Sequence, residues 1–150
     1  MQPDGTRILF SQNSANVILD LSKDWKDQTL HSLPTPENNE RFVAWDWSPD
    51  GKKLIGTLST SRVTYYSFET NRYEKVVNVG SYPKWFPDSS RFIFVVDGNA
   101  HVGDIATKRV RELLAIPEMQ MRSIAISRDG QLIYLTPQSD ESDIWLLDLP

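Results

Sequence analysis

Cysteine is absent from the 150 residues, and this excludes thiolate nucleophiles, disulfides and zinc-thiolate sites together. No stretch approaches the roughly 18 consecutive apolar residues that a membrane-spanning helix needs. Basic charge is not concentrated either, because the sixteen Lys and Arg residues are scattered and the net charge is −4. Nucleic-acid binders gather Lys and Arg on one face. We therefore expect no membrane span and no nucleic-acid partner, and the redox compartment stays open.

A tetrapeptide recurs four times along the chain. The copies are Gln2-Pro3-Asp4-Gly5, Ser48-Pro49-Asp50-Gly51, Phe86-Pro87-Asp88-Ser89 and Ser127-Arg128-Asp129-Gly130. They are separated by about 46, 38 and 41 residues, a period typical of β-propeller blades, and a short β-prone apolar run follows each copy. The repeat predicts an all-β protein, a β-propeller fragment of about four blades.

The tetrapeptide has the composition of a tight turn. Pro presets φ at the second position, Asp bonds back to the backbone, and Gly accepts a positive φ. We therefore interpret the following as structural turn residues: Pro3, Asp4, Gly5, Pro49, Asp50, Gly51, Pro87, Asp88, Asp129 and Gly130. The four aspartates could also suggest a metal site, because carboxylates are hard oxygen ligands. Each belongs to its own hairpin, however, so the four should be spread around a ring and not converge.

Each repeat is expected to hold four antiparallel strands, called a to d from the propeller axis outward. The blades are predicted at approximately 1–34, 41–79, 82–116 and 121–150. In each copy, a polar residue ends the β-prone run assigned to strand c. These residues are Asp20, Ser67, Asp104 and Asp148. Val110, Leu113 and Leu114 would also suit a short helix, but the repeat phase and Pro117 favour a strand. The strand count leaves no segment for strand a of the first repeat or strand d of the last, so we expect two complete blades flanked by two incomplete ones.

Two segments carry a resemblance to a known family. Trp47-Ser48-Pro49-Asp50-Gly51-Lys52-Lys53-Leu54 and Asp143-Ile144-Trp145-Leu146-Leu147-Asp148 resemble the Pro-Asp repeat of TolB-like propellers, which is related to the WD-repeat. The family includes bacterial periplasmic accessory proteins, extracytoplasmic sensor halves of kinases and transcription regulators, and propellers that gate prolyl-oligopeptidase-type peptidases. The resemblance implies the fold and favours a periplasmic or extracytoplasmic location, but a fold does not choose among functions.

No catalytic residue and no cofactor site is predicted. An acyl-transfer enzyme needs a nucleophile beside a base and an orienting acid, and the only histidines are His31 and His101, with no Gly-x-Ser-x-Gly motif. We expect His101 to be a strand residue packed against a neighbouring blade and His31 to be solvated. Asp97-Gly98-Asn99 could hold a calcium ion, but a turn between strands b and c is favoured.

The binding surface is expected on the face where strand d leads to the next strand a and strand b turns into strand c, because loops vary while sheets hold them. Its longest loop, Pro34 to Arg41, is acidic. The candidate binding residues are Glu37, Glu40, Arg41, Asp46, Lys84 and Arg122, of which Asp46 and Lys84 should lie at equivalent inner-strand positions near the central channel. Trp45, Trp47, Trp85 and Trp145 could stack a ligand, but packing between blades is favoured.

The predicted function is a non-catalytic interaction or scaffold module that binds a protein or peptide. The alternative is an accessory propeller of a larger sensor kinase, transcription regulator or prolyl-oligopeptidase-type peptidase. A carbohydrate- or ligand-binding propeller is a third class, with aromatic residues but no convergent polar set. The isolated chain is expected to self-associate or to need further blades, because an open ring exposes strand edges and an apolar blade face.

Overall fold

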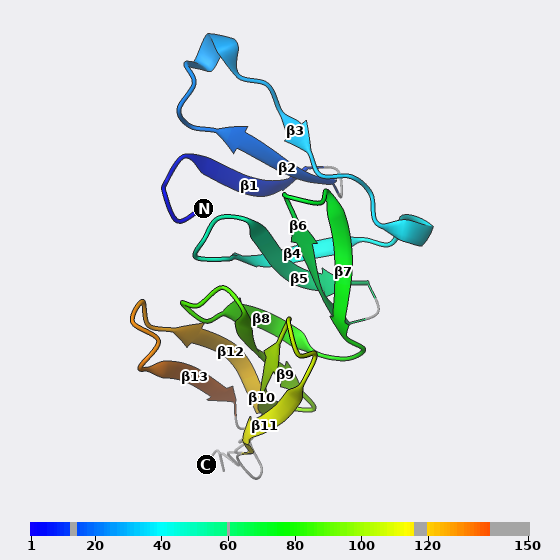
Figure 1. Ribbon diagram of the computed structural model, residues 1–150, viewed down its shortest axis with the longest axis vertical. Helices are drawn as coiled ribbons and strands as arrows, with labels where there is room; N and C mark the ends of the chain where they lie inside the picture. Colours follow the sequence, from blue (N-terminus) through cyan, green and yellow to red (C-terminus); the bar gives the residue numbers. More distant parts are fainter. Residues whose placement is uncertain (13–14, 60, 116–119, 139–150) are drawn as a thin grey trace, which may run out of the picture.

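Thirteen strands form four antiparallel sheets in the computed structural model, which describes residues 1–12, 15–59, 61–115 and 120–138 (Figure 1). Blade 1 contains β1 (Arg7–Gln12), β2 (Ala15–Asp20) and β3 (His31–Ser32). Blade 2 contains β4 (Phe42–Trp47), β5 (Lys53–Leu58), β6 (Arg62–Ser67) and β7 (Arg72–Val77). Blade 3 contains β8 (Ser81–Trp85), β9 (Arg91–Val96), β10 (Asn99–Asp104) and β11 (Val110–Leu114), and blade 4 contains β12 (Gln120–Ile126) and β13 (Ile133–Gln138).

This architecture confirms the predicted all-β, partial propeller of about four blades. The helix considered for residues 110–114 is wrong, because these residues form strand β11 beside β10. Strand d of blade 1, which the repeat predicts at residues 29–33, covers only His31–Ser32. Strand c of blade 4, expected at residues 144–149, lies outside the described residues. In the described part of the chain no helix is long and apolar enough to cross a membrane, and the two 3₁₀ turns are η1 (Trp25–Asp27) and η2 (Glu37–Asn39).

The four Pro-Asp turns share one geometry. In each, the N–H of the fourth residue donates to the carbonyl of the first at 2.8–3.1 Å. The fourth residue has a positive φ in every turn, for example 72° at Gly51, and Ser89 adopts 57° where glycine is missing. The turns lie along the left side of Figure 1, and η2 lies on the right.

Three apolar clusters lie between consecutive blades. The first joins Ile18 of blade 1 to Phe42, Trp47, Leu54 and Tyr66 of blade 2. The second joins Ile55, Val63 and Tyr65 of blade 2 to Trp85, Phe92 and Phe94 of blade 3. The third joins Phe86, Ile93, Val95, Ala100 and Val102 of blade 3 to Met121 and Ile124 of blade 4.

Strand alternation explains how one blade serves two cores. The neighbours Leu54 and Ile55 belong to different clusters, as do Phe92 and Ile93, because successive side chains point to opposite faces of a sheet. We call the side of a blade that faces the next blade along the chain its front face and the opposite side its back face. Each core therefore pairs one front face with one back face.

Candidate functional site

The carboxylates of the Pro-Asp turns are used within their own hairpins. Each of Asp4, Asp50, Asp88 and Asp129 accepts a hydrogen bond from the backbone N–H two residues later, at 2.9–3.1 Å. The N–H of Thr6 is the main cause of the lowered pKa of Asp4. In the described part of the chain, no group of three His, Asp or Glu side chains is placed to hold a metal ion. The turn aspartates thus shape hairpins and do not converge on a ligand.

The innermost strands of blades 2 and 3 are joined by polar side chains. The Asp46 carboxylate accepts the backbone N–H of Trp85 at 3.0 Å, and Lys84 Nζ donates to the carbonyl oxygen of Trp45 at 2.9 Å. Burial raises the pKa of Asp46, while the nearby Lys84 charge opposes that rise. The Trp45 ring meets the Tyr82 ring edge-on at a centroid distance of 5.1 Å. Asp46 and Lys84 therefore fasten two blades together.

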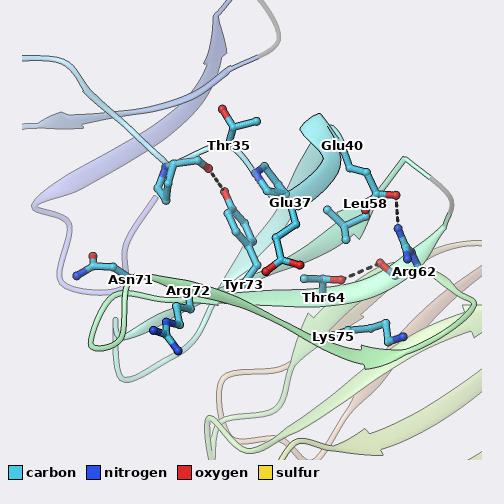
Figure 2. A pocket seen from close by; sticks show the side chains of 12 residues that line it. Thr35, Glu37, Glu40, Leu58, Arg62, Thr64, Asn71, Arg72, Tyr73 and Lys75 are labelled. Atoms are coloured by element: carbon cyan, nitrogen blue, oxygen red, sulfur yellow. Dashed lines mark hydrogen bonds and ion pairs between the residues drawn. The ribbon is translucent and has the colours of Figure 1, made fainter.

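A groove of about 670 Å³ lies between the connection from blade 1 to blade 2 and the back face of blade 2 (Figure 2). Its lining residues are Pro34, Thr35, Pro36, Glu37, Glu40, Leu58, Arg62, Thr64, Asn71, Arg72, Tyr73 and Lys75. Figure 2 shows Asn71 and Arg72 at one end and Glu40 and Arg62 at the other. The groove therefore follows the outer strands β6 and β7 along their length.

The connection that forms one wall of the groove is tied to blade 2 at both ends. The Tyr73 hydroxyl donates to the carbonyl oxygen of Pro34 at 2.8 Å. At the other end, the Arg62 guanidinium pairs with the Glu40 carboxylate, and the backbone N–H of Arg41 donates to Ser59 Oγ at 3.2 Å. Burial raises the pKa of Tyr73, which keeps its hydroxyl protonated as a donor. The groove is consequently preformed.

Charges of both signs line this groove. Within the described ranges, Glu37, Arg72 and Lys75 take part in no ion pair, whereas Glu40 and Arg62 neutralise each other. Figure 2 shows the Glu37 side chain extending from η2 toward the groove floor. The groove can therefore offer one carboxylate and two cations to a bound molecule.

Among the described residues, the two histidines do not assemble a catalytic set. His31 is exposed, and its Nε2 lies 3.2 Å from Thr29 Oγ1, but in the described structure no carboxylate is hydrogen-bonded to its ring. His101 is half-buried; its Nδ1 lies 3.2 Å from the Asn99 carbonyl oxygen, and its Nε2 lies 3.9 Å from Glu112 Oε2. The His101 ring packs against Phe94 in its own blade.

The structure separates the candidate binding residues into two places. Glu37, Glu40 and Arg41 lie together on the connection beside the groove, whereas Asp46 and Lys84 lie on the inner strands and do not line it. Arg122 belongs to β12, but its side chain lies outside the description.

The other singled-out residues lie mostly in structural positions. Trp47 and Trp85 are buried between blades, whereas Trp45 is 38% exposed and Trp145 lies outside the described residues. Asp97 and Gly98 form the turn between β9 and β10.

Sequence reasoning missed Thr64, Tyr73 and Lys75, groove residues that come from strands. Tyr73 and Lys75 are two residues apart on β7, and Arg62 and Thr64 are two apart on β6, so each pair shares one face of blade 2. That alternation is visible in the sequence. It does not reveal that the Pro34–Arg41 connection lies over this face.

No protein-family model matches the sequence, and no curated protein matches it. Solved structures are similar in fold. The tricorn protease matches with a TM-score of 0.62 and 11% identity over 87% of this chain and 14% of that one. The β-propeller domain of Cps50 (Swd1) from Myceliophteria thermophila matches with a TM-score of 0.61 and 9% identity, over 88% of this chain and 49% of that one.

A putative TolB from Agrobacterium tumefaciens matches with a TM-score of 0.62 and 11% identity, over 95% of this chain and 70% of that one. The chain thus spans less than half of the first two structures. Identities this low establish a fold and no finer function. The chain therefore has the TolB-like, WD-repeat-like β-propeller fold, of which it forms about four blades.

Proposed function

We propose that this chain is a non-catalytic binding module that takes an extended protein or peptide segment in the groove beside β7. The observation that supports this most is a preformed groove of about 670 Å³ that carries charges of both signs. Ligand sites commonly measure about 300–1,000 Å³ and use a few placed polar groups for specificity. An extended segment lying along β7 could place a basic group near Glu37 and an acidic group near Lys75.

The non-catalytic part of the proposal rests on the side chains around the two histidines. His31 lacks an orienting acid in the described structure, and His101 has a carbonyl and a distant carboxylate as neighbours. Turnover of peptide or ester substrates that disappears in a folded His101→Ala variant would contradict it. We extend the proposal to an extracytoplasmic location on the resemblance of the Pro-Asp repeat.

The binding test starts from a displayed random-peptide library selected on the immobilised chain. Selected peptides are synthesised and titrated calorimetrically against the wild type, Glu37→Lys, Arg72→Glu and Lys75→Glu. Each charge reversal should weaken binding of a peptide that contacts that charge by at least about tenfold, or about 1.4 kcal/mol. The control is Lys26→Glu, which reverses an exposed charge on η1, outside the groove lining.

Two results would count against the groove. One is a set of selected peptides whose affinities are unchanged by all three reversals. The other is a folded chain that selects no peptide above background.

The similarity to the tricorn protease favours a second candidate function. Because this chain spans 14% of that structure, an accessory propeller of a larger sensor kinase, transcription regulator or peptidase is also consistent with the fold. The sequence that flanks these residues in the gene distinguishes the two, because only an accessory propeller adjoins a catalytic or DNA-binding domain.

A further inference from the structure

Blades 1 and 4 expose apolar side chains at repeat positions that are fully buried in blades 2 and 3. Tyr134 follows its turn aspartate by five residues, as Ile55 and Ile93 do, yet it is 57% exposed where they are 0% exposed. Phe10 follows its turn aspartate by six residues, as Phe94 does, yet it is 36% exposed where Phe94 is 0% exposed. An apolar side chain at a position that internal blades bury is thus exposed at each end of the described blade stack.

The two exposed side chains lie on opposite types of blade face. Ile55 and Ile93 belong to front faces, so Tyr134 lies on the front face of blade 4. Phe94 belongs to a back face, so Phe10 lies on the back face of blade 1. Every internal core of the chain pairs a front face with a back face. The front face of blade 4 and the back face of blade 1 are therefore the two kinds of face that pack together in the internal cores.

Contacts between neighbouring turns are interrupted at the same two ends. A Cβ added at Gly51 would lie 2.8 Å from Gln2, and one added at Gly130 would lie 3.0 Å from the Pro87 ring. Ser89 Oγ likewise accepts the Asp50 N–H at 3.0 Å. In each case the last residue of a turn touches the turn of the preceding blade.

Gly5, the last residue of the first turn, has nothing within 4 Å of an added Cβ. Within the described part of the chain, the turn of blade 1 therefore lacks, at Gly5, the contact that the later turns make with the turn before them. The last turn, in blade 4, is followed by no further turn in the described residues.

We propose that a second copy of this chain occupies these faces. The front face of blade 4 in one copy packs against the back face of blade 1 in the other, and a two-fold axis repeats the contact so that the ring closes. Two sets of about four blades fall within the range of about four to eight that closed propellers use. Head-to-tail contacts that close produce rings without free interfaces. The same closure brings the turn of blade 4 to Gly5.

The first test measures the molar mass of the 150-residue chain by light scattering after size exclusion. We expect twice the monomer mass of 17.2 kDa at tens of micromolar protein. Phe10→Glu and Tyr134→Glu should each give monomers, and mixing the two variants should restore a dimer, because one front face and one back face remain intact. Val79→Glu is the matched control, since it charges an exposed apolar residue in the connection between blades 2 and 3, and it should leave the dimer unchanged.

The second test uses the absence of cysteine. The double variant Gly5→Cys and Arg128→Cys should be joined between copies by a short bis-maleimide, because Arg128 occupies the repeat position of Pro87, which touches the next turn. Each single variant should stay uncross-linked. The double variant Pro87→Cys and Gly130→Cys is the control and should cross-link within one chain. Ser89 shows that a side chain is accepted at the repeat position of Gly5.

Three results would overturn the proposal. They are a folded wild type that stays monomeric at tens of micromolar, a dimer that neither Phe10→Glu nor Tyr134→Glu weakens, and dimers cross-linked through Gly5→Cys alone. The cross-linking result decides the matter if either glutamate variant fails to fold.

Discussion

Replacing Gly51 by valine tests whether the Pro-Asp turns determine stability. The Gly51 N–H donates to the Ser48 carbonyl at 2.8 Å, and its φ of 72° lies in the left-handed region. An L-residue there costs about 1–2 kcal/mol, and a β-branched one tolerates this region worst. The nearest atom to an added Cβ is Nε2 of Gln2, the end of a flexible side chain that can move aside. We therefore assign the cost to the backbone and expect Gly51→Val to lose about 2 kcal/mol.

Gly51→Ser is the matched comparison, because Ser89 adopts a φ of 57° at the equivalent position. We expect a loss of about 1 kcal/mol for serine, clearly less than for valine. Urea unfolding followed by the fluorescence of the buried Trp47 and Trp85 measures both variants as midpoint shifts at constant slope. Each kcal/mol should lower the melting temperature by about 2–4 °C. All variants are measured at one protein concentration, because association changes apparent stability.

A Gly51→Val midpoint equal to that of the wild type would refute this reasoning, since the turn would then impose no positive φ. Equal losses for serine and valine would also contradict it, because the branched side chain should add strain.

Two further predictions concern hydrogen-bonded aspartates. Burial opposes ionisation of Asp88, but hydrogen bonds from the N–H groups of Arg91 and Ser90 outweigh it and lower its pKa from 3.8 to about 2. Because the folded pKa lies below the unfolded one, this stabilisation is fully present above about pH 5 and is lost as pH falls toward 2. The shift corresponds to about 2 kcal/mol, which solvent screening of the partly exposed side chain reduces to about 1. In the Asp88→Asn variant, the unfolding free energy should decrease less steeply than in the wild type as pH falls over that range. An equally steep decrease in both proteins would contradict the assignment. Asp46→Ala should cost about 1–3 kcal/mol because it leaves the Trp85 N–H without its acceptor, whereas Asp46→Asn should cost less; equal losses in urea unfolding would show that the bond between the blades contributes nothing.

Much of the fold could be predicted because its signals are local. The Pro-Asp-Gly composition is sufficient to indicate a turn, and Ser48-Pro49-Asp50-Gly51 forms the expected bond between its fourth and first residues. The phase of the repeat also placed a strand at Val110–Leu114, where local periodicity alone allowed a helix. Local chemistry and repeat phase together specify which segments are strands and where hairpins turn.

The groove could be predicted only in part. Loop length and acidity drew attention to Glu37 and Glu40, which do line it. Its floor was missed because Tyr73 and Lys75 belong to a strand, and alternation reports which face a side chain takes but not what covers that face. The covering depends on the hydrogen bond from Tyr73 to Pro34, which joins residues 39 apart in the chain. No local pattern encodes such a contact.

The contacts of Asp46 show a different limit of matching repeats. Matching the repeats aligns Asp46 with Lys84, which suggested two charges at equivalent places on the channel wall. Blades 2 and 3 are instead offset by one residue, although their turns are about 38 residues apart. Three hydrogen bonds between the two blades show this offset, because each joins residues 39 apart: Asp46 to Trp85, Trp45 to Lys84, and Asp50 to Ser89. Each residue of blade 2 therefore bonds to the residue that follows its repeat equivalent in blade 3; Asp46, for example, is equivalent to Lys84 but bonds to Trp85. A side chain at an inner strand meets the neighbouring blade's backbone and not the equivalent side chain, so a carboxylate there finds a backbone N–H and an ammonium finds a carbonyl. Charge at such positions therefore serves the contact between blades, whereas Glu37, Arg72 and Lys75 at the groove take part in no ion pair within the described residues.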